Sequence, residues 1–371
     1  SNVSLEGSSG QSALGGIKME VDYKAVAMED WRKQQNPGYE TYVTVNIKYT
    51  NNTNTTINKW SSYINAPDSK LLDNYSSDSN IVEENGKYTI NQDSRWSSGN
   101  IHSLPANGTY EIRDVHLASK VVASEFSLVY NFEGQGNDGN QYQDTNTGFT
   151  IFGGNNQGGE TTTSNVTIKD GYCFAVYGGN NAGGTNPTSN VTVDGGEANE
   201  VYGGNNLGGT NSTSNVIING GKVTNVYGGG NKAVTTKPNV TIQNDANILE
   251  SVYGGGNQAS IRTDTNVDIL GGNVVGNVYG GGNEGTVIGN TYVHVKNANV
   301  QSSVYAGGNG ITAIVYQNAN ATVEGTSTKI TGSVFGGGNQ AATGTIDNNN
   351  SLSKVNIVGA SIGKNVYGGA N

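Results

Sequence analysis

The stretch N-V-T-V-D-G-G-E-A-N-E-V-Y-G-G-N, Asn190–Asn205, decides the fold of most of the chain because close copies of it recur through the last two-thirds. Its most constant part is an aromatic residue followed by glycines, or alanine and glycines, and then asparagine; we call this group the anchor. Successive anchors are 25, 25, 25, 26, 26, 26, 30 and 32 residues apart. They begin at Phe152, Tyr177, Tyr202, Tyr227, Tyr253, Tyr279, Tyr305, Phe335 and Tyr367. This period is typical of a solenoid, whereas a propeller blade takes about 40 residues or more.

A strand-like run precedes each anchor, as in N-V-T-I at Asn165–Ile168 and N-V-D-I at Asn266–Ile269. Alternation places Val and Ile on one face, and a Gly-Gly turn follows in several repeats. We therefore expect a parallel β-helix over residues 151–371, with coils of about 25 residues stacked about 4.8 Å apart around a Val/Ile core. We expect the variable stretch after the anchor to absorb the changes in length. The anchor asparagines should stack as one hydrogen-bonded ladder, namely Asn180, Asn205, Asn231, Asn257, Asn283 and Asn309.

The anchor tyrosines raise the main functional question of the array. Because Val226 and Tyr227 are adjacent in a strand, they face opposite sides, and an inward Val implies an outward column of aromatic rings. Such a column could bind a sugar, or it could simply stack to stabilise the coils. Its members are Tyr177, Tyr202, Tyr227, Tyr253, Tyr279 and Tyr305.

Residues 17–133 read differently, with all three Trp residues and most of the charge. Alternation in Tyr39–Tyr49 and turn signals such as Asn107-Gly108 predict an antiparallel β-sandwich. The expected strands are Ile17–Ala27, Tyr39–Tyr49, Thr56–Ile64, Lys87–Gln92, Gly108–Leu117 and Phe126–Phe132. Residues 1–16 are expected to form an N-terminal arm, and residues 134–150 a flexible linker.

The run V-T-V-N-I-K-Y-T-N-N-T-N-T-T-I-N-K-W, Val43–Trp60, resembles the family 2 bacterial cellulose-binding modules, which carry a strand, a T-N-T turn and an I-N-x-W strand here. The run W-S-S-G-N-I-H-S-L-P-A-N-G-T, Trp96–Thr109, resembles their W-N-G-x-I-x-x-G-G segment. Such modules hold crystalline cellulose or chitin on three coplanar aromatic rings. The resemblance implies that Trp31, Tyr75 and Trp96 bind glycan and that Trp60 lies in the core. The family's disulfide is absent, and Tyr75 stands where Trp is usual.

Trp31 and Trp96 lie in polar surroundings, which is typical of exposed rings that bind ligands. The alternative is that both rings fold back and cap the ends of the sandwich. The array, in turn, resembles the V-Y-G-G-G-N repeats of large surface proteins of anaerobic Gram-positive bacteria. That resemblance implies a secreted or cell-surface location.

Composition excludes several other classes. Net charge is −10 with few clustered cations, which argues against nucleic acid as a partner. No run is long and apolar enough for a membrane span, and the chain opens without a recognisable leader, as a processed or excised piece would. The single cysteine, Cys173, should be a small packed residue.

No catalytic, metal or cofactor site is expected. His102, His116 and His294 are isolated, and no nucleophile motif occurs. Because many parallel β-helices are pectin lyases, a lyase site is an alternative, and its nearest candidates are Arg262, Asp264 and Asp268, which make only a small cluster.

The sequence thus predicts a non-catalytic extracellular adhesion protein whose sandwich binds an insoluble, cellulose-like polysaccharide and whose solenoid is a rigid stalk. The first alternative is a structural fibre or surface-layer subunit that self-associates. The second alternative is a polysaccharide lyase resembling pectate lyases.

Overall fold

The computed structural model describes residues 1–7, 13–74, 81–91, 101–345 and 350–371, and it divides into two compact units. Unit 1 consists of Ser1–Ser8 and Gly148–Asn371, and unit 2 consists of Ser9–Thr147. The described chain is all-β, as predicted, apart from the helix α1 (Asp30–Gln35) and the short 3-10 helix η1 (Ala123–Glu125). Unit 2 is therefore inserted in the sequence of unit 1 and does not simply precede it.

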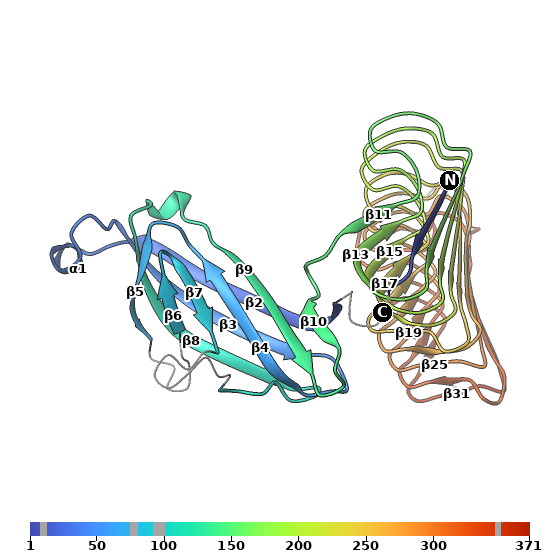
Figure 1. The fold of residues 1–371 in the computed structure, drawn as a ribbon. Helices are drawn as coiled ribbons and strands as arrows, with labels where there is room; N and C mark the ends of the chain where they lie inside the picture. The colour runs from blue at the N-terminus through green and yellow to red at the C-terminus, as the bar shows by residue number, and fades with distance from the viewer. Residues whose placement is uncertain (8–12, 75–80, 92–100, 346–349) are drawn as a thin grey trace. The chain divides into compact units, whose positions relative to one another are not determined.

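Unit 1 is the expected parallel solenoid, and its coils are seen stacked in Figure 1. Its first sheet has nine parallel strands, and each repeat contributes one strand through its N-V-x-I run. In spatial order they are β1 (Asn2–Leu5), β12 (Thr163–Ile168), β14 (Thr188–Val193), β16 (Thr213–Ile218), β18 (Lys237–Ile242), β21 (Thr265–Ile269), β24 (Thr291–Lys296), β27 (Ala319–Glu324) and β30 (Ser353–Val358).

The second sheet has 14 strands and carries the anchors. Its early coils contribute single strands: β11 (Thr150–Phe152), β13 (Tyr172–Tyr177), β15 (Glu197–Tyr202) and β17 (Lys222–Tyr227). Later coils contribute two short strands each: β19 (Asn247–Ile248) and β20 (Val252–Tyr253), β22 (Asn273–Val274) and β23 (Val278–Tyr279), β25 (Asn299–Val300) and β26 (Val304–Tyr305), β28 (Lys329–Ile330) and β29 (Val334–Phe335), and β31 (Ser361–Ile362) and β32 (Val366–Tyr367).

The split explains why the period grows from 25 to 26 residues. Val223 and Val226 are three positions apart in the early register, whereas their partners Ile248 and Val252 are four apart. The extra residue therefore sits in the bend between β19 and β20, before the anchor. The expectation that only the stretch after the anchor absorbs length is wrong for this step. It holds for the last coil, where the added residues lie in the sequence between Phe335 and the start of β30 at Ser353.

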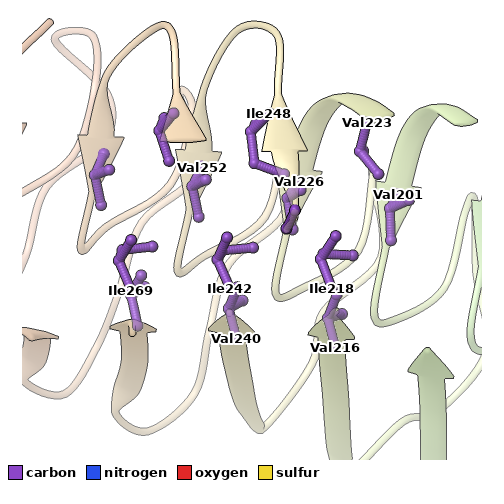
Figure 2. Close-up of a cluster of buried hydrophobic side chains, with 14 of the residues drawn as sticks. Val201, Val216, Ile218, Val223, Val226, Val240, Ile242, Ile248, Val252 and Ile269 are labelled. Carbon is purple, nitrogen blue, oxygen red and sulfur yellow. The ribbon is translucent and has the colours of Figure 1, made fainter. Parts of the chain in front are cut away.

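The core of unit 1 is the predicted Val/Ile column. Val216 and Ile218 of one sheet point at Val223 and Val226 of the other, and each is at most 1% exposed (Figure 2). Burying one such side chain contributes about 1.5–3 kcal/mol, and every coil repeats the arrangement. The stability of this unit is thus spread along the stack, as in other repeat proteins.

The asparagine ladder is present but was assigned partly to the wrong residues. Asn231 Nδ2 donates to Asn206 Oδ1 at 2.9 Å, so the continuous ladder runs through the second asparagine of the early anchors. Its members are Asn156, Asn181, Asn206, Asn231, Asn257, Asn283, Asn309, Asn339 and Asn371, with amide contacts of 2.8–3.0 Å. Asn180 and Asn205, both fully buried, belong to a separate inner ladder that starts at Asn155.

The inner ladder stops because Gly230 takes the place of an asparagine in the next coil. A Cβ at Gly230 would lie 2.4 Å from the Ala233 carbonyl oxygen and 2.5 Å from that of Asn205. No side chain fits there, so the anchor changes from G-G-N-N to G-G-G-N and the outer ladder continues alone.

The N-terminal residues are not a free arm. The run S-N-V-S-L, Ser1–Leu5, repeats S-N-V-T-I of Ser164–Ile168, and β1 pairs with β12 in parallel register. Asn165 Nδ2 donates to Asn2 Oδ1 at 2.9 Å, and Lys169 Nζ lies 2.6 Å from Glu6 Oε1. The remainder of the expected arm also differs, since β2 already begins at Leu14.

Unit 2 forms one continuous nine-stranded sheet, antiparallel except for the parallel pair β2–β10. In order its strands are β5 (Ser69–Asn74), β8 (Thr109–Ser119), β3 (Thr41–Asn51), β2 (Leu14–Ala27), β10 (Gln141–Asp144), β9 (Val129–Gly136), β4 (Ile57–Asn65), β7 (Lys87–Ile90) and β6 (Ile81–Glu84). The sheet folds over itself into two layers. The contact between them is seen at Tyr49 on β3 and Trp60 on β4, whose ring centroids lie 4.8 Å apart. The expected strands are present within a few residues of their predicted ends.

The expected linker 134–150 is instead part of both units. Tyr142 and Asp144 are 6% and 1% exposed, and β10 joins the two layers of unit 2. Thr150 already pairs with Ala175 in the solenoid. Gly136, Gly139 and the asparagines between β9 and β10 form the turn that connects these two strands. Within the described residues, no helix has the length and apolar character needed to cross a membrane.

Candidate functional site

The anchor tyrosines form a regular stack along unit 1. Neighbouring ring centroids lie 4.6–5.1 Å apart and the ring planes are 3–11° from parallel, from Phe152 to Tyr367. The valines before them point into the core and the rings point the other way, as predicted. Yet the rings from Tyr177 to Phe335 are only 3–7% exposed. Within that range both faces of each ring are covered by neighbouring rings, so the inner part of the column offers no flat face to a sugar.

A polar column runs beside the hydroxyl groups from Glu200 onward, two residues before each aromatic. Asn277 Nδ2 donates to the Tyr279 hydroxyl at 3.0 Å. From Asn225 onward each side chain in the column accepts a backbone N–H from the next coil at 2.8–3.2 Å. Burial raises the pKa of Tyr177 to about 12, with the Glu200 carboxylate adding to the shift. This geometry favours the interpretation in which the column stabilises the coils.

Two carboxyl groups near the column have unusual environments. Burial raises the pKa of Glu197 to about 7, opposed by the charge of Lys222 in the next coil. Burial also raises the pKa of Glu200 to about 7, and its Oε2 has no hydrogen-bond partner. Both residues belong to β15, in the regular part of the solenoid. Their burial therefore affects the stability of the solenoid, and we assign them no catalytic role.

Trp31 is the exposed aromatic side chain that the sequence predicted. It lies on α1, none of whose residues is buried, and it is 51% exposed. Its indole N–H donates to the Glu29 carboxylate. The Arg32 guanidinium carbon lies 4.4 Å from the centroid of the Trp31 ring and 4.0 Å from that of Tyr42. The arginine thus joins the exposed ring to the sheet, a contact that holds the indole in place.

The other two predicted glycan contacts, Tyr75 and Trp96, lie outside the described residues. Trp60 is 2% exposed and packs against Tyr49 and Phe132, which confirms its assignment to the core. Trp31 is not folded back as a cap, so that alternative is wrong for this residue. Cys173 is fully buried, as expected, and burial raises the pKa of its thiol to about 12.

The structure does not bring the candidate lyase residues Arg262, Asp264 and Asp268 together. The Asp264 carboxylate accepts a hydrogen bond from the backbone N–H of Asn290 at 2.7 Å and so stabilises a corner of the next coil. Arg262 is exposed and makes no ion pair within the described part of the chain. Asp268 instead contacts His294, with Oδ1 3.5 Å from Nδ1.

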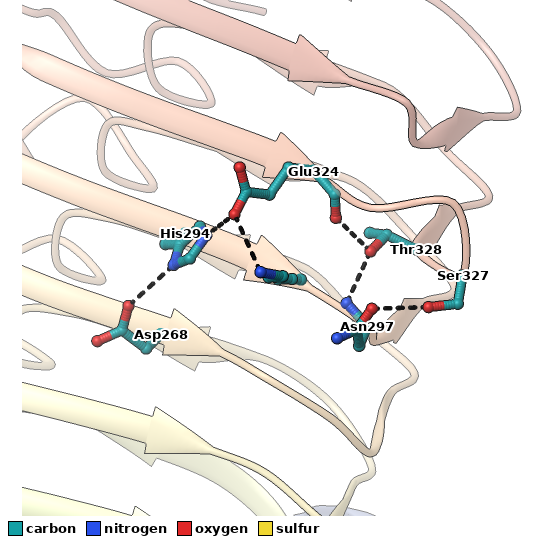
Figure 3. Close-up of polar contacts among 7 residues, drawn as sticks. Asp268, His294, Asn297, Glu324, Ser327 and Thr328 are labelled. Atoms are coloured by element: carbon teal, nitrogen blue, oxygen red, sulfur yellow. Dashed lines mark hydrogen bonds and ion pairs between the residues drawn. The ribbon is translucent and has the colours of Figure 1, made fainter.

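His294, which was expected to be isolated, lies at the centre of a polar cluster. Its Nε2 lies 3.0 Å from Glu324 Oε1, which is also 3.8 Å from Lys296 Nζ (Figure 3). The signal was present in the sequence, because Asp268 and His294 are one period apart and pair in register. These groups lie on the outer face of the first sheet, where they contact one another across neighbouring coils. Among the described residues, no group of His, Cys, Asp and Glu is arranged to hold a metal ion.

Comparisons with known proteins give little beyond the fold. No family model matches the chain, and comparison with curated proteins found no match. A glycoside hydrolase family 20 exo-β-N-acetylglucosaminidase from Vibrio harveyi, solved with N-acetylglucosamine, is similar over 34% of this chain and 17% of its own, with 16% identity and a TM-score of 0.21. Pectate lyase PelI from Erwinia chrysanthemi, solved with tetragalacturonic acid, is similar over 82% and 85%, with 9% identity and a TM-score of 0.16. Scores this low carry no functional argument.

Proposed function

We propose that the chain is a non-catalytic polysaccharide-binding protein of the bacterial cell surface. The solenoid acts as a rigid frame, and the inserted unit 2 binds an insoluble, cellulose-like glycan through Trp31, with Tyr75 and Trp96 as further contacts. The observation that supports this most is the exposed indole on a helix that buries nothing. A helix without a buried residue contributes little to the stability of the fold. We therefore attribute the role of α1 to the exposed Trp31 side chain that it presents to solvent.

The chemistry of the ring suits a sugar. The axial C–H groups of a β-linked pyranose form an apolar face, and a flat indole can stack on it at little entropic cost. One such contact is weak, but an insoluble glycan offers many equivalent sites to a chain that is fixed at a surface. The surface location rests on the resemblance of the anchors to repeats of bacterial surface proteins.

The test is a depletion isotherm of the whole chain on microcrystalline cellulose and, in parallel, on chitin. We expect Trp31→Ala to lower the association constant at least tenfold. The matched control is Tyr292→Ala, which removes a ring that is 42% exposed on the solenoid and should bind like the wild type. Failure of the wild type to bind either glycan, or equal binding by Trp31→Ala, would contradict the proposal.

A further inference from the structure

A polar groove of about 530 Å³ lies on the outer face of the layer formed by β2, β3 and β8 in unit 2. Its size is within the usual range of small-ligand sites. Two rows of side chains cross its floor. In the first row Glu20, Lys48 and Glu111 are neighbours in register on the three strands. No aromatic side chain lines the groove, so it differs in kind from the Trp31 surface.

The second row is built on a β-bulge. Asp22 pairs with Asn46, and the register between β3 and β8 shifts at Asn46, so that both Arg113 and Asp114 face outward. Asp114 has a positive φ of 56°, and its backbone N–H donates to Asn46 Oδ1 at 3.0 Å. A bulge commonly re-aims a side chain next to a binding site. Here it points the Asp114 carboxylate into the groove opposite Asp22.

Some charges of the groove are paired and others are not. Glu20 lies 3.5 Å from Lys18, and Arg113 contacts Glu111 at 2.6 Å. The side chains of Asp22, Asp114 and Lys48 make no ion pair or hydrogen bond within the described residues. Four carboxylates and two cations line the groove, and Lys18 beside Glu20 offsets one of the two excess negative charges, so the groove remains net negative. It therefore repels uronates and attracts a protonated amine.

We propose that this groove binds a hydroxyl-rich saccharide that carries protonated amines, such as an oligomer of deacetylated glucosamine. Asp22 and Asp114 bind the ammonium groups, and the Lys48 ammonium donates to a hydroxyl or ring oxygen. Charge-assisted hydrogen bonds of this kind are short and directional, and they need no stacked ring. The metal alternative is not supported, because the described carboxylates do not converge on one point.

The groove is independent of the proposed cellulose-binding surface, although both belong to unit 2. A chain that loses Trp31 should still bind the amino sugar, and a chain that loses the groove should still bind cellulose. Failure of one proposal is therefore distinguishable from failure of the other.

The experiment is isothermal titration of the whole chain with three probes: a glucosamine hexamer, its fully N-acetylated form and a galacturonate hexamer. We expect saturable binding of the glucosamine hexamer that is at least tenfold tighter than that of the other two probes. Asp22→Asn and Asp114→Asn should each weaken it about tenfold. Asparagine tolerates the positive φ at position 114, so the second variant should keep the bulge.

Two controls make the result specific. Glu133→Gln removes an exposed carboxylate on β9 outside the groove and should leave the affinity unchanged, as should Trp31→Ala. Circular dichroism verifies that each variant is folded. No saturable binding, equal binding of the acetylated hexamer, or wild-type affinity in both asparagine variants would overturn the proposal.

Discussion

Leu5 pairs in parallel register with Ile168, although the whole of unit 2 lies between them in the sequence. The two ends of the insertion reach the same region of unit 1. A Cβ on Gly7 would lie 3.0 Å from the Gly171 nitrogen, and one on Gly148 would lie 2.9 Å from the Tyr172 ring. Insertion at such neighbouring points disturbs a host fold little. The solenoid and the inserted domain can therefore have separate roles.

The pairing of β1 with β12 should depend on the alternation of negative and positive side chains at one register position of successive coils. Glu6, Lys169 and Asp194 follow one another across the first coils, and Lys169 Nζ lies 2.6 Å from Glu6 Oε1. Lys169→Glu would place three acidic groups in a row, so we expect faster amide hydrogen exchange at residues 2–5. Adding Glu6→Lys should restore protection. Equal exchange in the wild type and both variants would show that this column does not hold β1.

The buried aromatic stack should be a main source of solenoid stability. Tyr227 is 6% exposed and stacks on Tyr202 at 4.6 Å and on Tyr253 at 4.9 Å. Tyr227→Ala leaves a cavity between two rings and should cost about 3–5 kcal/mol in the free energy of unfolding. Thermal and denaturant unfolding followed by circular dichroism measures it. Glycan retention by the folded variant should not change.

Two variants serve as controls for the stack. Tyr227→Phe keeps the ring and should cost much less than Tyr227→Ala. Tyr367→Ala removes a ring that is 43% exposed and should also cost less. If Tyr227→Ala were as stable as the wild type but lost glycan binding, the column would be a binding surface after all.

Glu197 should make stability depend on pH. Burial raises its pKa from 4.5 to about 7, so between these values the folded state binds more protons than the unfolded state. Its stabilising contribution is therefore complete below pH 4.5 and is lost as pH rises through about 7. Glu197→Gln should be more stable than the wild type at pH 8, by on the order of 3 kcal/mol.

The comparison at acid pH decides the cause. At pH 4.5 the wild-type carboxyl is mostly neutral in the folded state, and the two proteins should unfold at similar denaturant concentrations. An equal difference at both pH values would mean that the substitution acts through packing and not through charge.

Much of the solenoid was predictable because each coil repeats the same pattern of apolar, aromatic and glycine positions. The period, the inward Val226 and the stacked Tyr227 follow from the alternation and spacing of the anchors. The ladder assignment of Asn205 was wrong although the spacing distinguishes it, since Asn206 and Asn231 each lie four residues after their aromatic and Asn205 lies three. The contact between Asp268 and His294 was not predicted, because neither residue belongs to a recognisable motif and only the one-period spacing links them.

The inserted domain was predicted in its strands but not in its boundaries. The repeat S-N-V-S-L at Ser1–Leu5 was visible in the sequence, yet its partner lies beyond the whole of unit 2. Residues around Tyr142 look like a linker by composition, but burial of that ring against the sheet overrides composition. Trp31 could be predicted to be exposed from its polar neighbours, whereas its contact with Arg32 and Tyr42 depends on tertiary packing.

In the proposed division of roles, unit 1 is a frame and unit 2 carries glycan binding. The most direct measurement replaces Ser9–Thr147 with a short glycine-rich linker and compares the product with the whole chain on cellulose. We predict that the shortened chain keeps the β-sheet circular dichroism signal and cooperative unfolding of the solenoid but is no longer retained. Retention of the folded, shortened chain at the wild-type level would contradict the account.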